Sequence, residues 1–367
     1  MTLTRAWPLL LSLLLLQGCS WIKSWGKDDD PAAPAELVEF ESTLATRKAW
    51  SQSVGSGLGK GDPQLRPVYW DGSLYTADYK GRVVAVNAES GNVRWQIKTE
   101  LPLSGGPGVN GENLFIGTQD GEVHALSTGD GTLLWTAQVS SEILAAPVAG
   151  DGVVVVRCID GRIFGLDEAS GRRLWIYDRS VPLLTLRGNA VPVIWAGVAY
   201  IGYDGGEVVA LDLETGIVMW EQTVVTSEGR SELERLADID GDLVYVASDL
   251  IVSSYKNRLA SLAADSGRLL WFKDIASATG VVVDRTSLAI SDRTGHLWLL
   301  DRRNGADLWK QDRLENRELT RPAFMGNFVV VGDFEGYLHW INLEDGNFAA
   351  REKVGGDAVS YTHLRAH

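Results

Sequence analysis

Pro107–Trp135 reads Pro-Gly-Val-Asn-Gly-Glu-Asn-Leu-Phe-Ile-Gly-Thr-Gln-Asp-Gly-Glu-Val-His-Ala-Leu-Ser-Thr-Gly-Asp-Gly-Thr-Leu-Leu-Trp. Its short apolar runs alternate with polar residues, and Gly, Asn or Asp bounds each run, which is typical of strands joined by tight turns. The stretch therefore predicts four short antiparallel strands, with turns at Asn110–Gly111, Thr118–Gly121 and Ser127–Gly131.

The closing tryptophan of this stretch recurs along most of the chain at intervals of about 40 to 50 residues. The copies are Trp50, Trp95, Trp135, Trp175, Trp220, Trp271 and Trp309, with Ala350 where the next would fall. Repeats of this length with four strands each indicate an all-β fold, a β-propeller in which each repeat supplies roughly one blade.

Two kinds of small residue accompany the tryptophans. Glycines recur in the turns, where a positive φ suits glycine, and a small residue such as Ala85 or Gly165 recurs on the third strand. We expect this small residue to make room for an indole from a neighbouring sheet. The tryptophans are accordingly interpreted as fillers of the wedge-shaped gaps between blades, rather than as platforms that stack on a ligand.

The number of blades is predicted by counting strands. Seven complete units run from near Leu65 to near Val354, and one further outer strand, around Trp50, precedes them. An orphan outer strand needs three inner partners from the C-terminus, which predicts an eight-bladed propeller of four-stranded antiparallel blades. Residues 360–367 carry no repeat anchor, so we expect the last blade to be truncated in this chain.

The N-terminal region is expected to lie outside the propeller. The apolar run Trp7–Leu16 has the length of a signal peptide and is too short to span a membrane. The run ends in Leu-Gln-Gly-Cys19, which resembles the lipobox of bacterial lipoproteins, where the cysteine is acylated. By the same resemblance, Ser20 directs the lipid-anchored protein to the periplasmic face of the outer membrane. Ordinary secretion, with Cys19 as an incidental thiol, is the alternative.

These observations predict four segments. They are a signal peptide at 1–18, a lipid-anchored flexible tether at 19–44, the β-propeller at 45–359 and a non-repeat tail at 360–367. Cys158 is the only other cysteine, so we expect no internal disulfide in the propeller.

The charge balance limits the partners. The 34 Lys and Arg residues against 48 Asp and Glu residues give a formal net charge of -14. An acidic surface repels phosphate backbones and anionic membrane faces. We therefore expect no nucleic-acid partner, and we expect the membrane to be reached through the lipid anchor only.

Signals for catalysis are weak throughout the chain. His124, His296 and His339 fall on third strands of different blades, where the ring would hold them apart rather than around one metal ion. Most Asp and Glu residues fall in turns, where they serve backbone hydrogen bonds, and no Ser-His-Asp or metal-ligand spacing stands out. The sequence therefore predicts no catalytic residue, no metal site and no cofactor.

Two successive connections between blades are longer than the others. Measured to Gly197 and Gly241, the connections after Trp175 and Trp220 exceed the usual length by about five residues. Such connections emerge on one face of a propeller, so we expect the two insertions to be neighbours on one rim.

The content of the two insertions suits a partner protein. The first contains Leu184, Leu186 and Arg187, and the second contains Asp238 and Asp240. Leucines flanked by arginine are typical of interface anchors, with acidic residues as a polar rim. Leucines that tuck under their own loop are the alternative reading of the same residues.

The repeat in its fullest form is Ala210-Leu-Asp-Leu-Glu-Thr-Gly-Ile-Val-Met-Trp220. From Trp50 to about Ala350 it resembles the repeat of the pyrroloquinoline-quinone-type propellers. One branch of that superfamily comprises quinoprotein dehydrogenases, and another comprises non-enzymatic outer-membrane lipoproteins of the β-barrel assembly machinery.

The insertions resemble two segments of the lipoprotein branch. The run Leu184-Thr-Leu-Arg-Gly188 looks like its Leu-x-Leu-Arg-Gly segment, and Asp238-Ile-Asp240 looks like its Asp-x-Asp segment. In that branch the two segments contact the periplasmic POTRA domains of BamA, the subunit that inserts barrels.

The resemblance implies a non-catalytic scaffold that binds BamA and other subunits of the assembly complex and assists the folding and insertion of outer-membrane proteins. Unfolded outer-membrane proteins, held at exposed strand edges, are a further expected partner. The alternative is a pyrroloquinoline-quinone-dependent dehydrogenase or a relic of one, although the adjacent cysteine pair of those enzymes is absent here. A propeller that binds peptidoglycan or another polymer is a third hypothesis.

Overall fold

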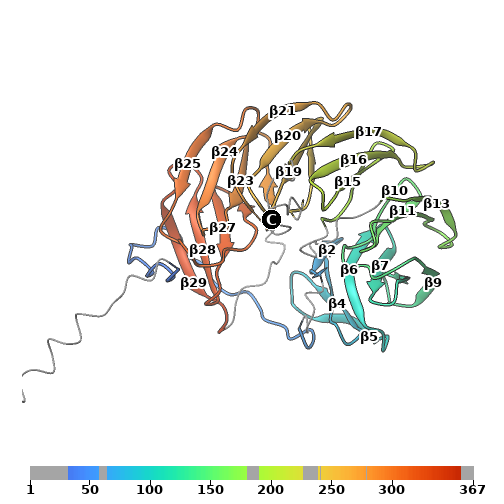
Figure 1. The fold of residues 1–367 in the computed structure, drawn as a ribbon. Helices are drawn as coiled ribbons and strands as arrows, with labels where there is room; N and C mark the ends of the chain where they lie inside the picture. Colours follow the sequence, from blue (N-terminus) through green and yellow to red (C-terminus); the bar gives the residue numbers. More distant parts are fainter. Residues whose placement is uncertain are drawn as a thin grey trace, which may run out of the picture.

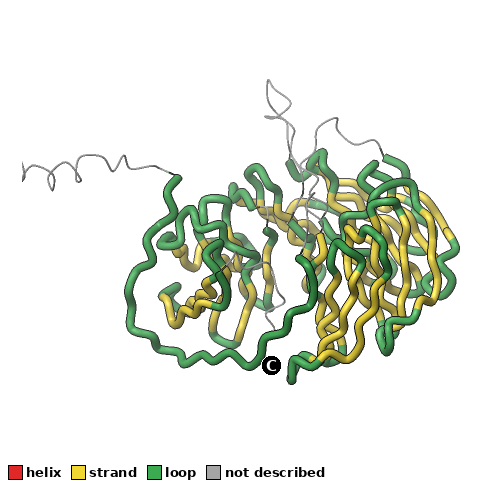
Figure 2. The backbone as a smooth tube through the Cα atoms, turned by 90° about the horizontal axis from the view of Figure 1, so that it is seen from below, coloured by secondary structure: helices red, strands yellow, loops and turns green. Residues whose placement is uncertain are grey.

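The computed structural model describes residues 32–57, 64–179, 190–225, 239, 241–277 and 279–356. Throughout these ranges the chain forms strands, turns and loops, as Figure 2 shows. The same ranges accordingly contain no helix of the length and hydropathy that a membrane span requires. The predicted signal peptide, Cys19 and the tail at 360–367 lie outside the described residues.

Seven antiparallel sheets, which we number as blades one to seven, follow one another around a common centre (Figure 1). Blades one to four are β2 (Val68–Trp70), β3 (Ser73–Ala77), β4 (Arg82–Asn87) and β5 (Val93–Lys98); β6 (Leu103–Asn110), β7 (Asn113–Thr118), β8 (Glu122–Ser127) and β9 (Leu133–Gln138); β10 (Val148–Gly150), β11 (Val153–Arg157), β12 (Ile163–Asp167) and β13 (Arg173–Tyr177); and β14 (Val193–Trp195), β15 (Val198–Gly202), β16 (Glu207–Asp212) and β17 (Val218–Thr223).

Blades five to seven continue in the same strand order. They are β18 (Val244–Val246), β19 (Asp249–Ser253), β20 (Leu259–Ala263) and β21 (Leu269–Lys273); β22 (Val281–Val283), β23 (Ser287–Ser291), β24 (Leu297–Asp301) and β25 (Asp307–Gln311); and β26 (Ala323–Met325), β27 (Phe328–Gly332), β28 (Tyr337–Asn342) and β29 (Phe348–Lys353). In addition, β1 (Gln64–Leu65) pairs in parallel with β6 and ties the lead-in of blade one to blade two.

The four strands and three turns predicted for Pro107–Trp135 are confirmed by β6 to β9, which form blade two. The second and third strands of each blade are almost wholly buried, whereas the outer strands expose alternate residues, as β8 and β9 illustrate. The core therefore lies between the faces of successive blades.

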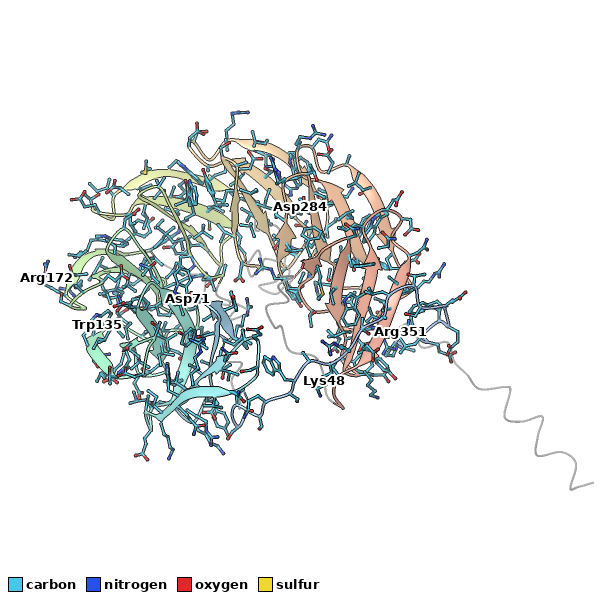
Figure 3. All side chains as sticks on the ribbon, turned by 180° about the vertical axis from the view of Figure 1, so that it is seen from behind. Lys48, Asp71, Trp135, Arg172, Asp284 and Arg351 are labelled. Carbon is cyan, nitrogen blue, oxygen red and sulfur yellow. The ribbon has the colours of Figure 1, made fainter. Side chains whose placement is uncertain are left out.

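The closing tryptophans join consecutive blades by one repeated contact. The indole of Trp95 covers Gly131 in the next blade, where an added Cβ would lie 2.9 Å from the ring, and its Nε1 donates to the Thr128 carbonyl at 2.8 Å. Trp135, Trp175, Trp220, Trp271 and Trp309 repeat this contact on Gly171, Gly216, Gly267, Gly305 and Gly346. Figure 3 shows Trp135 close to the turn that carries Arg172. The interpretation of the tryptophans as wedge fillers is thus confirmed.

The small residues of the third strands have a different neighbour from the one predicted. Gly165 pairs with Trp175 across its own sheet, and a Cβ added at Gly165 would meet that indole. Ala85 likewise pairs with Trp95 of its own blade. The small residue therefore lets the indole of its own outer strand lie flat on the sheet, from which it reaches the glycine of the next blade.

The predicted eight-bladed ring is wrong, because the described chain forms seven four-stranded blades. The extra blade was inferred from Trp50, which was assigned to an orphan outer strand. Trp50 does cover Gly91 and donates to the Ala88 carbonyl at 3.0 Å, as the other tryptophans do. It does so, however, from a segment that is not a strand. The indole contact needs only a tryptophan at the right place, so its presence does not imply a sheet behind it.

Residues 32–57, here called the N-terminal strap, lie along blade seven and then reach blade one (Figure 1). Within this strap, residues 35–44 belong to the segment expected to be a tether. The amide of Ala35 donates to the Glu315 carbonyl at 2.9 Å, and Phe40 stacks on Phe348 with 5.3 Å between ring centroids. Figure 3 shows Lys48 on the path from Arg351 towards blade one.

Leu44 of the strap fills the place left by the missing tryptophan of blade seven. It packs against a buried cluster that includes Ala349, Ala350 and Trp340. Since Ala350 stands at the closing position, an apolar side chain from the strap replaces the indole that the other blades supply themselves.

A buried polar network also fastens the strap to blade seven. Arg317 donates through Nε to Asp333 at 2.8 Å and through Nη1 to the Ala35 carbonyl at 3.0 Å. His339 Nε2 lies 3.0 Å from the same carboxylate oxygen of Asp333. Burial acts to raise the pKa of the Asp333 carboxyl, but hydrogen bonds from His339, the Tyr337 amide and Arg317 outweigh it and lower that pKa from 3.8 to about 2.

Replacing a glycine under an indole is expected to cost more than replacing a matched glycine in open space. Gly152 has φ +81° with nothing within 4 Å of an added Cβ, so Gly152→Ala should lower the free energy of unfolding by about 1 kcal/mol through strain alone. Gly171 has φ +70°, and its Cβ would lie 2.5 Å from the Trp135 ring. Overpacking is added there, so we expect about 3 kcal/mol for Gly171→Ala. Urea unfolding of both variants tests this, and equal losses would contradict it.

Acid is expected to weaken the network in blade seven. Because the pKa of Asp333 is lower in the folded state, its contribution to stability is complete above pH 4 and is lost as the pH falls towards about 2. The loss should amount to about 2 kcal/mol. Urea unfolding at a series of pH values should show a shallower pH dependence for Asp333→Asn than for the wild type. The control Asp312→Asn, at an exposed position, should keep the wild-type slope.

Candidate functional site

All five predicted partner-binding residues lie outside the described residues. Leu184, Leu186 and Arg187 fall within 180–189, and Asp238 and Asp240 flank the single described residue Ile239. Their assignment to a BamA-binding site therefore stays a prediction. The structure does describe the chain on both sides of each insertion, and these flanks define the base of the rim.

The bases of the two insertions meet in one buried cluster between blades four and five. Ala190 ends the first insertion, Val224 and Val225 begin the second, and Ile239 and Leu243 lie towards its end; all five belong to the same cluster. The Ile239 amide also donates to the Tyr203 carbonyl of blade four at 3.3 Å. The expectation that the insertions are neighbours on one rim is supported by these shared anchor points.

The second insertion ends later than the glycine pattern indicated. The sequence analysis measured its length to Gly241, but the hairpin turn between β18 and β19 is formed by Ala247 and Ser248, with φ of 49° and 83°. Turn glycines mark this position in other blades, as Gly197 does between β14 and β15. The left-handed conformation is therefore held here by residues for which it is strained, and the connection is longer than predicted.

A buried ion pair supports the base of the first insertion. Arg157 at the end of β11 is 1% exposed, donates to Asp204 of blade four at 2.6 Å, and contacts the Ala190 carbonyl through its other terminal nitrogen at 3.5 Å. Its guanidinium also lies over the Tyr203 ring, 5.5 Å from the centroid. Burial raises the pKa of the Tyr203 hydroxyl, which therefore stays protonated at neutral pH.

Arg179 continues this network on the other side of Tyr203. It lies 5.1 Å from the Tyr203 ring centroid, 2.8 Å from Glu221 and 3.4 Å from Glu207. Burial works against the charged form of Arg179, but the hydrogen bond from Glu221 and the two carboxylates outweigh it and hold its pKa above the usual range. The last described residue before the first insertion is thus fixed to blade four.

Asp242 lies at the centre of the ring, directly after the second insertion. Its Oδ2 accepts hydrogen bonds from Arg66 of blade one at 2.8 Å and from Arg321 of blade seven at 2.9 Å. Its Oδ1 accepts the Val191 amide, just after the first insertion, at 3.3 Å. Burial acts to raise the pKa of Asp242, but the charges of both arginines outweigh it and hold that pKa below the usual value. One carboxylate therefore ties both insertions to the ring.

These three charged residues beside the channel were missed by the sequence analysis. They stand at equivalent positions of the repeat, each the same distance in sequence ahead of the closing residue of its blade. The seven equivalents are Arg66, Gly106, Ala146, Val191, Asp242, Gly280 and Arg321. All but Gly280 line a cavity of about 320 Å³. Comparing this position across the repeats would have found the signal, since charge replaces small residues in only three copies.

The histidines are spread as the sequence predicted. His124 in β8 contacts Glu122 at 3.1 Å and Thr136 at 3.2 Å, while His339 in β28 is buried beside Asp333. Among the described residues no group of His, Cys, Asp and Glu is arranged to hold a metal ion. Cys158 is a buried free thiol, and burial raises its pKa to about 11, which keeps it protonated and unreactive at neutral pH.

Breaking the buried pair at the base of the rim is expected to be costly. Asp204→Ala should lower the free energy of unfolding by about 3 kcal/mol, because Arg157 would be left buried without its counter-ion. Lys98→Ala, which breaks an exposed pair with Glu100, should change it by less than about 0.5 kcal/mol. The double variant Arg157→Met with Asp204→Leu should be more stable than Asp204→Ala alone. A small effect of Asp204→Ala in urea unfolding would contradict this reading.

Comparison with known proteins places the fold first. The repeats and blades define a β-propeller of the pyrroloquinoline-quinone-repeat class. A quinohemoprotein alcohol dehydrogenase from Comamonas testosteroni shares this fold with a TM-score of 0.63 over 87% of this chain and 71% of that one, at 14% identity. At that identity the likeness concerns the fold alone.

The family is shown by closer matches. The family model described as "Outer membrane protein assembly factor BamB" matches residues 43–103 and 79–311. Proteins of that name from Pseudomonas aeruginosa and Escherichia coli K12 are 50% and 38% identical, over 96% and 95% of this chain and 91% and 90% of theirs. The crystal structure of BamB from Moraxella catarrhalis superimposes with a TM-score of 0.75 at 30% identity, over 81% of this chain and 89% of that one. The chain belongs to the BamB family of outer membrane protein assembly factors.

Proposed function

We propose that this chain is a non-catalytic scaffold lipoprotein of the outer-membrane β-barrel assembly machinery. It binds POTRA domains of BamA through Leu184, Leu186 and Arg187 of the first insertion and Asp238 and Asp240 of the second. In this role it assists the folding and insertion of outer-membrane proteins, while acylated Cys19 holds it at the periplasmic face of the outer membrane. Membership of the BamB family supports the role, since its members are named as assembly factors.

The observation that carries the binding site is the common base of the two insertions. Ala190, Val225 and Ile239 pack in one cluster, and Asp242 accepts the amide of Val191, so both insertions start from the same rigid part of the ring. A partner that touches one insertion is therefore within reach of the other. Arg157 and Arg179 hold blade four beneath them through ion pairs with Asp204 and Glu221.

The site is tested by recovery of BamA with the lipidated protein from membranes. Leu186→Ala with Arg187→Ala should reduce the recovered BamA by about tenfold or more, since buried anchors carry most of the binding energy of an interface. The pair Asp238→Ala with Asp240→Ala should act in the same direction. The control Ile217→Ala removes a side chain that is 67% exposed at the other end of β17 and should leave recovery unchanged. Undiminished recovery from both double variants, each with a wild-type urea midpoint, would sink the assignment.

A further inference from the structure

Every outer strand contains one extra residue opposite the third strand. In blade two, for example, Ala125 pairs with Trp135 and Leu126 pairs with Leu133, which leaves Leu134 as the extra residue of a β-bulge. The equivalent residues in blades one to seven are Arg94, Leu134, Leu174, Met219, Leu270, Leu308 and Ala349. We call them the bulge residues.

Five consecutive blades carry a large apolar bulge residue that is exposed. The exposed fractions in blades two to six are 50% for Leu134, 37% for Leu174, 55% for Met219, 38% for Leu270 and 54% for Leu308. Neighbouring residues widen several of these patches, as Ile217 and Val218 do in blade four. An apolar residue repeated at one exposed position in five blades is not explained by packing within the ring.

The seventh blade shows what binds at this position. The carbonyl of its bulge residue, Ala349, accepts hydrogen bonds from the Thr43 amide at 2.9 Å, the Leu44 amide at 3.2 Å and the Ser42 hydroxyl at 3.0 Å. Leu44 packs on the apolar cluster beside it, and Thr46 donates to Glu352 further along β29 at 2.7 Å. The strap thus docks on the outer strand as an extended segment, with backbone donors on the bulge and an apolar side chain beside it.

The outer strands of blades two to six offer the same combination. In the part of the chain that the structure describes, β9, β13, β17, β21 and β25 are each the last strand of their sheet. Natural edge strands are commonly protected by lysine, proline or strong twist, whereas these edges present leucine or methionine at the bulge. The bulge interrupts regular pairing, so the geometry favours a short extended segment over a long added strand.

We propose that the outer edges of blades two to six are docking sites for short extended segments of unfolded polypeptide, bound as residues 42–44 are bound to blade seven. A helix does not fit this mode, because its backbone amides are already bonded within the helix. Strands of membrane β-barrels alternate apolar and polar residues, so an unfolded chain of that class supplies both the amide donors and the apolar side chains. That choice of occupant rests on the proposed function, whereas the docking mode does not.

Binding of a labelled peptide tests the docking mode. The probe is a short fluorescent peptide of alternating leucine and threonine with one arginine, titrated with the full chain and followed by fluorescence anisotropy. The same peptide N-methylated at alternate amides should bind about tenfold more weakly or worse, because its backbone donors are removed. A peptide of the same composition arranged to form an amphipathic helix should also bind more weakly. Equal affinity for the three peptides would overturn the proposal.

Substitutions at the bulge residues locate the sites. Met219→Lys with Leu270→Lys, on neighbouring blades, should weaken binding of the alternating peptide by about tenfold. Val354→Lys is the matched control, since Val354 is 40% exposed but lies beyond β29 in blade seven, and it should bind as the wild type does. Affinity for the peptide that stays within about twofold of wild type in the double variant would place binding elsewhere and overturn the proposal.

The same variants separate this inference from the proposed BamA site. Met219→Lys with Leu270→Lys should still recover BamA from membranes, whereas Leu186→Ala with Arg187→Ala should still bind the peptide. Loss of BamA recovery only in the insertion variant, with peptide binding unaffected by the lysines, would leave the proposed function standing and remove the docking sites.

Discussion

An indole lying flat on a glycine of the next blade is the contact on which the ring depends. Tryptophan supplies a large apolar face and one hydrogen-bond donor, and the turn supplies a glycine and a carbonyl three residues before it. The glycine is required twice, once for its positive φ and once because a Cβ would enter the ring, as at Gly171. Since the indole stands on the outer strand, the contact also fixes that strand. The orientation of the bulge residues, one position before each tryptophan, follows from it.

Much of this architecture could be predicted because its constraints are local. Gly131 and its equivalents must be glycine, the third strand must be small beneath the indole, and each strand alternates, so the pattern repeats in the letters themselves. Trp50 shows the limit of that reasoning. Its indole satisfies the same contact on Gly91 from a segment without a sheet, and counting it as a strand gave one blade too many. The sequence records the contact but not the structure that delivers it.

The candidate site was less predictable because its support comes from distant parts of the chain. The unusual length of the insertions was visible, but the true turn of blade five uses Ala247 and Ser248 in place of glycine, so its boundary was misplaced. Asp242 gathers Arg66 and Arg321 from the two ends of the ring, a convergence that only closure of the fold creates. The bulge leucines were in plain view beside the tryptophans, yet only the register of the outer strands shows that they point outward.

The N-terminal strap determines how a load passes into the molecule. A pull on the chain ahead of residue 32 reaches blade seven first, where Arg317 and Arg351 hold the carbonyls of Ala35 and Val38 and Ala349 holds two successive amides. Only after these bonds yield does the force arrive at Trp50 and blade one. The hydrogen bonds lie in series along the strap, so they share no load and give way one after another. The last blade in the sequence is therefore the first to bear tension, and the junction between the ends of the ring is shielded behind it.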